Sequence, residues 1–281
     1  MRIFKIYIGF MIMFVCIPIT SSAYDFNTVH PAINEYAVNQ SDLEDILINR
    51  LGFSKGIETV FQKEFDKMTI VQWVQLGGRM EDQPESRGVE HFFDPFETWD
   101  DAGLSIIPLS FSSLWWAALP RQDIGTFPGG GSHSWFDARK GFWLGLTSTT
   151  KAERDTNFAE CFRSIGHVMH LVSDLSVPAH VRDDCHYPDW PFNDPDPYEL
   201  WTQKEAKNLV YTGPNSTFDA LIFDRAVNLE QIPLPISALW DQDRYDGTNP
   251  EVTWSDQQVG LAEFSNANFF RADKIMTRRS I

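Results

Sequence analysis

The sequence predicts an all-α protein that folds as a single multi-helix domain with a loop-rich insertion. Apolar residues recur at helical spacing over long stretches, two of these stretches begin with a capping-box pattern, and strand-like alternation is scarce. Of the 281 residues, 43% are hydrophobic and 22% are charged, so the chain has enough apolar material for a core. That composition excludes a disordered or collagen-like polymer.

The first helices are expected ahead of the insertion. The capping-box pattern Ser41-Asp42-Leu43-Glu44 predicts a helix that ends at Gly52. A second helix is expected from about Gly56 to Leu76, ending at the pair Gly77-Gly78. Residues 80–131 are rich in proline and glycine and predict a long insertion with short helices, a kind of segment that often carries function.

Further helices are expected after the insertion. Helical spacing resumes near Trp135, strengthens over residues 150–173 and ends before Pro178. It returns over residues 198–210, and a last helix is expected after Ser255. Neither an internal repeat nor a linker divides the chain after residue 23, which favours one domain over residues 24–281.

The first 23 residues have the pattern of a secretory signal peptide. Arg2 and Lys5 precede an apolar run over residues 6–19, and Ser21-Ser22-Ala23 supplies the small residues of a cleavage site. The apolar run is shorter than a bilayer-spanning helix. We therefore expect a mature chain that begins at Tyr24 and is soluble and secreted or periplasmic.

Charge and cysteine content narrow the chemistry further. A formal net charge of −16 gives no electrostatic footprint for duplex nucleic acid, which is bound mainly through Lys and Arg. Cys161 and Cys185 remain after cleavage, and a disulfide and two free thiols are both open for them. Neither residue belongs to a CxxC pair, so zinc ligated by cysteine is not indicated.

Candidate metal ligands concentrate around one expected helix. His170 and Asp174 are four residues apart and His167 is one turn earlier, so they share one side of the helix. Apolar neighbours predict that this helix is buried, and buried His and Asp side chains need a strong partner such as a metal ion. Pro178 then turns the chain and presents His180.

The segment His170-Leu-Val-Ser-Asp174-Leu-Ser-Val-Pro178-Ala-His180 resembles the HxxxD and PxH signature of the zinc-dependent phospholipase C and single-strand-specific nuclease superfamily. The resemblance covers most of the mature chain. It implies an all-helical fold with a trinuclear zinc site that uses the mature N-terminal amine, histidines and carboxylates. The implied ligands are Tyr24, His30, Asp82, His91, His170, Asp174, His180, His186 and Glu199.

The resemblance also implies how these ligands divide among three zinc ions. Asp82, His91, His170 and Asp174 would hold one ion; Tyr24, His30 and a shared Asp174 a second; His180, His186 and Glu199 a third. The family starts with Trp where this chain has Tyr24, and it has a His where this chain has Pro195. His186 is the favoured replacement because zinc prefers nitrogen ligands, and Asp196 is the alternative.

Divalent ions lower the pKa of bound water and stabilise the negative charge of a reacting phosphate, which is the chemistry of phosphodiester hydrolysis. The resemblance implies this reaction, and it implies that Asp82 orients or deprotonates the attacking water. The expected substrate is a phospholipid head group, with transient membrane contact. Aromatic residues in the segment 114–119 could settle into a lipid interface, although burial in the core is the commoner fate of such a run. A single-strand nuclease or nucleotidase and a non-catalytic secreted metal-binding protein remain alternatives.

Overall fold

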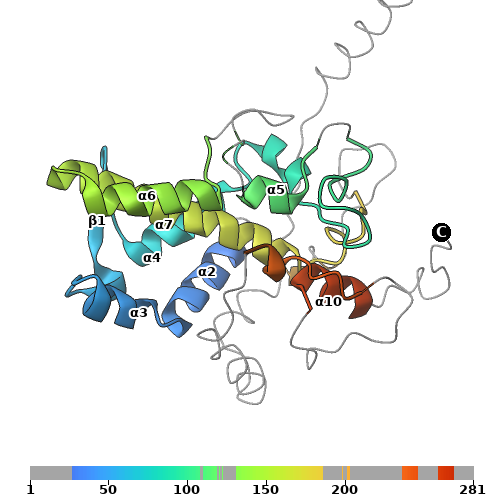
Figure 1. Ribbon diagram of the computed structural model, residues 1–281, viewed down its shortest axis with the longest axis horizontal. Helices are drawn as coiled ribbons and strands as arrows, with labels where there is room; N and C mark the ends of the chain where they lie inside the picture. Colours follow the sequence, from blue (N-terminus) through green and yellow to red (C-terminus); the bar gives the residue numbers. More distant parts are fainter. Residues whose placement is uncertain are drawn as a thin grey trace, which may run out of the picture.

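The computed structural model describes residues 27–107, 110–118, 120, 122, 131–185, 198, 201–202, 236–245 and 259–268. Within these residues the protein is predominantly helical, as the sequence predicts (Figure 1). The expected signal peptide, the expected ligands Tyr24, His186 and Glu199, and most of the expected helix over residues 198–210 lie outside the described residues.

The elements follow one another in a fixed order. They are α2 (Val29–Gln40), α3 (Leu43–Asp45), the π-helical turn η1 (Ile46–Arg50), η2 (Gly56–Glu58), β1 (Val60–Lys63), β2 (Asp66–Thr69), α4 (Ile70–Met80), η3 (Glu85–Glu90), α5 (Ser113–Ala118), α6 (Trp135–Thr147), α7 (Lys151–Asp174), η5 (Ile236–Leu239) and α10 (Leu261–Asn268).

The long helix α7 is the centre of the fold, with α6 along one side and α4 and α2 along another (Figure 1). Its start is fixed by a capping box, in which the Thr150 hydroxyl accepts from the Glu153 N–H at 3.2 Å and the Glu153 carboxylate accepts from the Thr150 N–H at 3.1 Å. The helix predicted over residues 150–173 is confirmed to within one residue. Apolar residues on α7 join both main clusters of the core.

Helices α2, α4 and α7 approach one another closely because the contact positions carry small side chains. A Cβ atom on Gly77 would lie 2.0 Å from the Arg163 carbonyl oxygen, and one on Gly78 would lie 2.4 Å from the Asn34 amide. The buried Asn34 amide donates to the carbonyl oxygens of Val74 and Gly166 at 3.1 Å. These contacts hold the three helices side by side.

The prediction of one helix from about Gly56 to Leu76 is wrong. A short antiparallel hairpin, β1–β2, occupies its first half, with Val60 paired to Thr69 and Glu64 in the left-handed region (φ 53°) at the turn. The Trp73 indole donates to the Phe61 carbonyl and holds the hairpin against α4. Helix α4 also continues through Gly77-Gly78, because tight packing on neighbouring helices uses these glycines inside the helix.

The helix expected at residues 41–52 forms without the predicted capping box. The Glu44 carboxylate accepts from the Ile57 N–H at 2.7 Å and therefore ties α3 to the following turn. Gly52 ends the helical segment as expected, with a φ of 74° and a bond from the Phe53 N–H to the Leu47 carbonyl.

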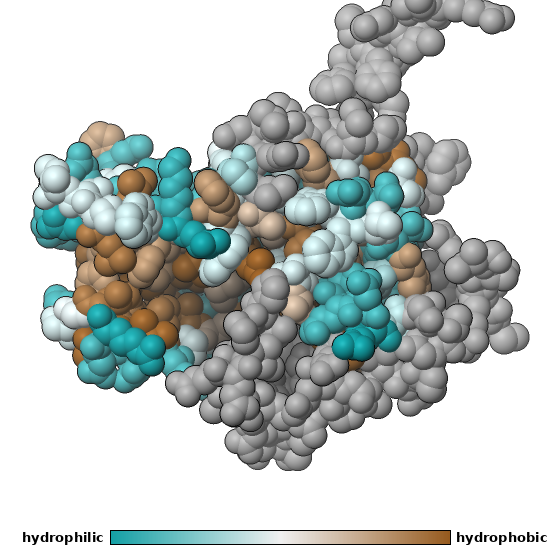
Figure 2. All heavy atoms as spheres, in the orientation of Figure 1, coloured by the Kyte–Doolittle hydropathy of each residue, from teal (hydrophilic) through white to brown (hydrophobic). Residues whose placement is uncertain are grey.

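The insertion is loop-rich, and it contributes to the core. Leu114 and Trp116 on α5 are each 2% exposed, so the expectation that the 114–119 aromatic run is mostly buried is confirmed for these residues. Brown, apolar atoms on the face drawn in Figure 2 gather elsewhere, between α6 and α3 and over β1 and α4. The last helix, α10, begins at Leu261, later than the expected start after Ser255.

Two further expectations are tested in the described part of the chain. Cys161 and Cys185 both lie there and form no disulfide with each other. Burial raises the pKa of the Cys161 thiol to about 12, which keeps it protonated and unreactive. The described helices include none that is both long and apolar enough to cross a bilayer.

Candidate metal centre

Five of the expected ligands meet in one buried cluster. His170 and Asp174 lie on the last turns of α7, and His30 lies on the first turn of α2. Asp82 follows the end of α4, and His91 follows the end of η3. None of the five is more than 2% exposed. We call these five residues the metal cluster.

Asp174 is the centre of the metal cluster. Its carboxylate lies 2.8 Å from His91 Nδ1, 3.3 Å from His30 Nε2 and 3.3 Å from His170 Nε2. Asp82 lies near two of these imidazoles, at 3.6 Å from His91 Nδ1 and 3.7 Å from His170 Nε2. The His30 and His170 rings stack with their centroids 3.5 Å apart. Two carboxylates and three imidazoles therefore surround one small volume.

The inward atoms of this cluster fit a cation. Among the described residues, only groups of the cluster itself lie near the carboxylate oxygens of Asp82 and Asp174 and the Nε2 atom of His170, and none of these atoms has a well-aligned hydrogen bond. Buried polar atoms are rarely left in this state, because each costs about 1–3 kcal/mol. A metal ion bound by their lone pairs would satisfy all of them together, and imidazole nitrogen with carboxylate oxygen is a donor set that suits Zn²⁺.

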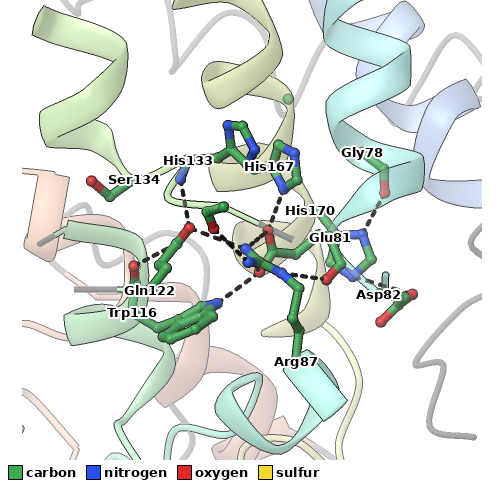
Figure 3. A network of polar contacts seen from close by, with 12 residues as sticks. Gly78, Glu81, Asp82, Arg87, Trp116, Gln122, His133, Ser134, His167 and His170 are labelled. Atoms are coloured by element: carbon green, nitrogen blue, oxygen red, sulfur yellow. Dashed lines mark hydrogen bonds and ion pairs between the residues drawn. The ribbon is translucent and has the colours of Figure 1, made fainter. Parts of the chain in front are cut away.

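Hydrogen bonds on the outward nitrogens orient two of the imidazoles. His170 Nδ1 donates to the Gly78 carbonyl oxygen at 2.7 Å, which leaves Nε2 facing the cluster (Figure 3). The Ser173 hydroxyl donates to the His170 carbonyl, so it accepts from His30 Nδ1 at 2.8 Å. His30 Nε2 then faces Asp174. Such outer contacts fix the tautomer that a metal ligand needs.

The charges of the cluster are strongly coupled. Burial would lower the pKa of His91, but the carboxylates of Asp174, Glu81 and Asp82 raise it to about 10. Burial would raise the pKa of Asp174, but His170 and His30 hold it well below its usual range. Burial raises the pKa of Asp82 to about 6. Without a metal, a protonated imidazole supplies the positive charge that these carboxylates require, and a divalent cation would replace it.

Two overlapping groups of three have ligand atoms close enough to share an ion, His30 with Asp82 and His170, and His91 with His170 and Asp174. Within each group, the ligand atoms all lie within 4.8 Å of one another. This grouping differs from the expected one, because His30 joins Asp82 and His170 in a group that does not contain Asp174. The short distance from His30 to Asp174 keeps the expected pairing available as well.

His180 lies beside the metal cluster and outside both groups. Its ring is stacked on Phe92 with centroids 4.6 Å apart, and its centroid is 6.3 Å from that of His91. His180 Nδ1 is 3.3 Å from the His91 carbonyl oxygen, and the His180 carbonyl accepts from the Phe93 N–H at 2.8 Å. The turn after α7 is thus joined to the loop that carries His91. The residues expected to complete a third site with His180 lie outside the described residues.

A buried polar network next to the metal cluster was missed by the sequence analysis (Figure 3). Its centre is Glu81, whose carboxylate accepts from Arg87 at 2.7 and 2.9 Å and from the Trp116 indole at 2.7 Å. His167 Nδ1 also contacts this carboxylate. Arg87 Nε donates to the Glu81 carbonyl as well, so Arg87 holds both the side chain and the backbone of the residue before Asp82.

His167 therefore supports the site from outside, through its contact with Glu81. Burial lowers its pKa to about 4, and its ring stacks on His133 with centroids 4.2 Å apart. The network continues from Arg87 to the Gln122 side chain at 3.1 Å. In the sequence, two adjacent acidic residues after a helix, Glu81 and Asp82, are a weak indication of this network. No local sequence pattern indicates that Glu81 contacts Arg87 or that His133 lies nearby.

Comparison with protein-family models, with curated proteins and with solved structures found no match to this chain. Buried carboxylates and imidazoles of this kind can bind a divalent cation, and a cation held there would lie beside Asp82, whose pKa is raised by burial to about 6. The chain is a mostly helical protein with buried His and Asp groups that could bind metal.

Proposed function

We propose that the protein is a secreted or periplasmic zinc-dependent phosphodiester hydrolase that resembles phospholipase C and acts on phospholipid head groups. The observation that carries the proposal is the convergence of His30, Asp82, His91, His170 and Asp174 in one buried volume. All five are among the ligands that the motif resemblance implies.

Zinc bound in the cluster would supply positive charge for the reacting phosphate and a bound water with a pKa near neutrality. The chain's own residues would hold and orient the reactants. Asp82 is suited to orient or deprotonate the attacking water, because both of its oxygens face the cluster and burial raises its pKa to about 6. Asp174 would act mainly as the shared ligand, since it lies against three imidazoles.

The choice of phospholipid rests on the resemblance, because in the segment considered for lipid contact Trp116 is buried and Trp115 is half-buried. A single-strand nuclease or nucleotidase is the alternative within the same chemistry. A non-catalytic metal-binding protein is the alternative outside it, and the departures at Tyr24 and Pro195 leave it open.

The test uses the full mature chain loaded with zinc. Hydrolysis is measured on phosphatidylcholine and on single-stranded DNA, with Asp82→Asn and the exposed neighbour Glu85→Gln as a matched pair. Asp82→Asn should lower kcat by roughly 10²- to 10⁴-fold, while Glu85→Gln should leave it unchanged. Activity on DNA alone would favour the nuclease. Bound zinc with neither activity would overturn the hydrolase proposal and favour a binding protein.

A third zinc ion would use His180 with residues outside the described part of the chain, so its completion is also a proposal. His186→Ala and Asp196→Ala are compared by zinc titration. If His186 is the ligand, its replacement should weaken one zinc by about ten- to a hundredfold or more and leave the others bound. A selective loss in Asp196→Ala alone would assign that ligand to Asp196.

A further inference from the structure

On helix α6 the large apolar side chains face outward and small residues face α7, which is the opposite of the usual arrangement in a surface helix. The side that packs on α7 is made of small residues, Ala138, Gly141 and Gly145, all buried. A Cβ atom on Gly141 would lie 2.9 Å from the Asn157 carbonyl oxygen, and one on Gly145 would lie 2.8 Å from the Phe158 ring. These small residues thus provide close contact between the two helices, and the partly buried Phe142 packs beside them on Phe158 of α7.

The outer side of α6 carries the large apolar residues. Phe136 is 50% exposed, Trp143 65% and Leu146 49%, and Trp135 is 36% exposed at the helix start. Positions 136, 143 and 146 fall on one stripe of a helix. Exposed apolar residues are ordinary when scattered singly, but a stripe of them on one helix marks an interaction surface.

The same stripe is positively charged. Arg139 and Lys140 are exposed and lie between Phe136 and Trp143 on the outer side. Asp137 is turned toward the helix start, where its carboxylate accepts from the Ser134 hydroxyl and N–H. The outer side of α6 is therefore aromatic and basic on a chain whose formal net charge is −16. We call these outer residues the α6 face.

We propose that the α6 face docks on the surface of an anionic phospholipid membrane. Trp, Phe and Leu together with Arg and Lys on one side of a helix are typical of helices that lie in the membrane interface. Anionic head groups attract this face and repel the acidic remainder of the protein, which fixes the orientation of docking. A symmetric contact between two copies is disfavoured, because it would bring Arg139 and Lys140 toward the same residues of the second copy.

Docking through the α6 face does not rest on the proposed function. Helix α6 lies on α7 and contributes none of the five metal-cluster residues. The aromatic segment at 114–119, which the sequence offered for lipid contact, is buried at Leu114 and Trp116, whereas Phe136 and Trp143 on α6 are exposed. Variants of the α6 face should therefore change membrane binding and leave zinc content unchanged.

The test is co-sedimentation of the full mature chain with vesicles of phosphatidylglycerol and, separately, of phosphatidylcholine. Trp143→Ser and Leu146→Ser should each weaken binding to phosphatidylglycerol vesicles about five- to tenfold, because part of the side chain's burial in the interface is lost. Leu239→Ser is the matched control, since Leu239 is 44% exposed on η5 and Leu146 is 49% exposed on α6. That control should bind as the unchanged protein does.

The charge contribution is measured with Arg139→Gln combined with Lys140→Gln. This variant should lose roughly thirtyfold in affinity for phosphatidylglycerol vesicles, because each basic side chain near an anionic surface gives about fivefold. Its weak binding to phosphatidylcholine should not change, and added salt should reduce the difference. Absence of binding to phosphatidylglycerol, or equal effects of Leu146→Ser and Leu239→Ser, would overturn the proposal. A dimer that Trp143→Ser dissociates, without vesicle binding, would assign the face to a second copy.

Discussion

Replacing Asp174 by Asn tests the centre of the metal cluster with the smallest change of shape. The substitution keeps the size of the side chain and removes its negative charge. Asp174 is fully buried and lies within 3.3 Å of nitrogens from His30, His91 and His170. An amide that must also place two hydrogens among these imidazoles cannot serve as the shared ligand of a cation.

The expected loss has two parts. Removing a residue that only hydrogen-bonds to a metal ligand lowers metal affinity by about ten- to a hundredfold. Loss of a shared ligand should therefore lower the affinity for zinc by about a hundredfold or more. The metal-free fold should also lose about 3–5 kcal/mol, as expected when one partner of a buried ion pair is removed. Because the folded-state pKa of Asp174 lies well below the usual 3.8, this contribution is present above pH 3.8 and disappears as the pH falls.

Zinc affinity is measured by competition with a chromophoric chelator, and circular dichroism shows whether the variant is folded under the same conditions. His167→Gln is the control, because His167 is equally buried on the same helix and contacts Glu81 outside the metal cluster. We expect the control to retain its zinc to within about tenfold. Equal metal loss in both variants, or full zinc occupancy in a folded Asp174→Asn protein, would refute the assignment of Asp174 as a shared ligand.

Three further predictions concern the fold around the site. In the metal-free protein, protonated His91 stabilises the fold fully below pH 6.5 and loses this effect as the pH rises toward its folded-state pKa of about 10. The free energy of unfolding, measured with urea, should therefore fall between these two pH values. A free energy that stays constant over this range would contradict the prediction. Arg87→Met should lower the free energy of unfolding by about 3–5 kcal/mol, because it leaves the buried Glu81 carboxylate without its partner. Arg87→Lys should lower it less, because Lys keeps the positive charge but cannot make the same set of hydrogen bonds. Equal losses of stability in thermal unfolding would argue against the ion pair. Gly77→Ala should cost about 1–3 kcal/mol or more, because its Cβ would collide with the Arg163 carbonyl, whereas the exposed Arg79→Ala should stay within about 0.5 kcal/mol.

Local sequence signals predicted the elements that local interactions determine. The 24-residue helix α7 was located almost to the residue, because apolar residues recur at helical spacing along its whole length. The hairpin β1–β2 was missed, because strands of four residues are too short for alternation to be distinguished from a helical pattern. Gly77-Gly78 was interpreted as a helix end, but its cause is the approach of α7, which no local pattern records.

The candidate site also contains residues that the sequence predicts and residues that it does not. His170 and Asp174 could be placed together from their spacing on one helix, and the motif resemblance added His30, Asp82 and His91, which the fold brings to the same volume. The contacts of Glu81 with Arg87, Trp116 and His167 could not be predicted, because they join residues from α7 and two parts of the insertion. Only the packed fold shows which loop residues are buried.

The most direct test of the central claim is zinc-edge X-ray absorption on the purified protein, combined with elemental analysis for bound metal. We predict bound zinc surrounded by nitrogen and oxygen ligands at about 2.0–2.2 Å, with the imidazole signal expected from His30, His91 and His170. Replacing Asp174 by Asn should remove most of that signal. A protein that binds no divalent metal when zinc is supplied, or that binds it through sulfur at about 2.3 Å, would contradict a metal centre built from these buried residues.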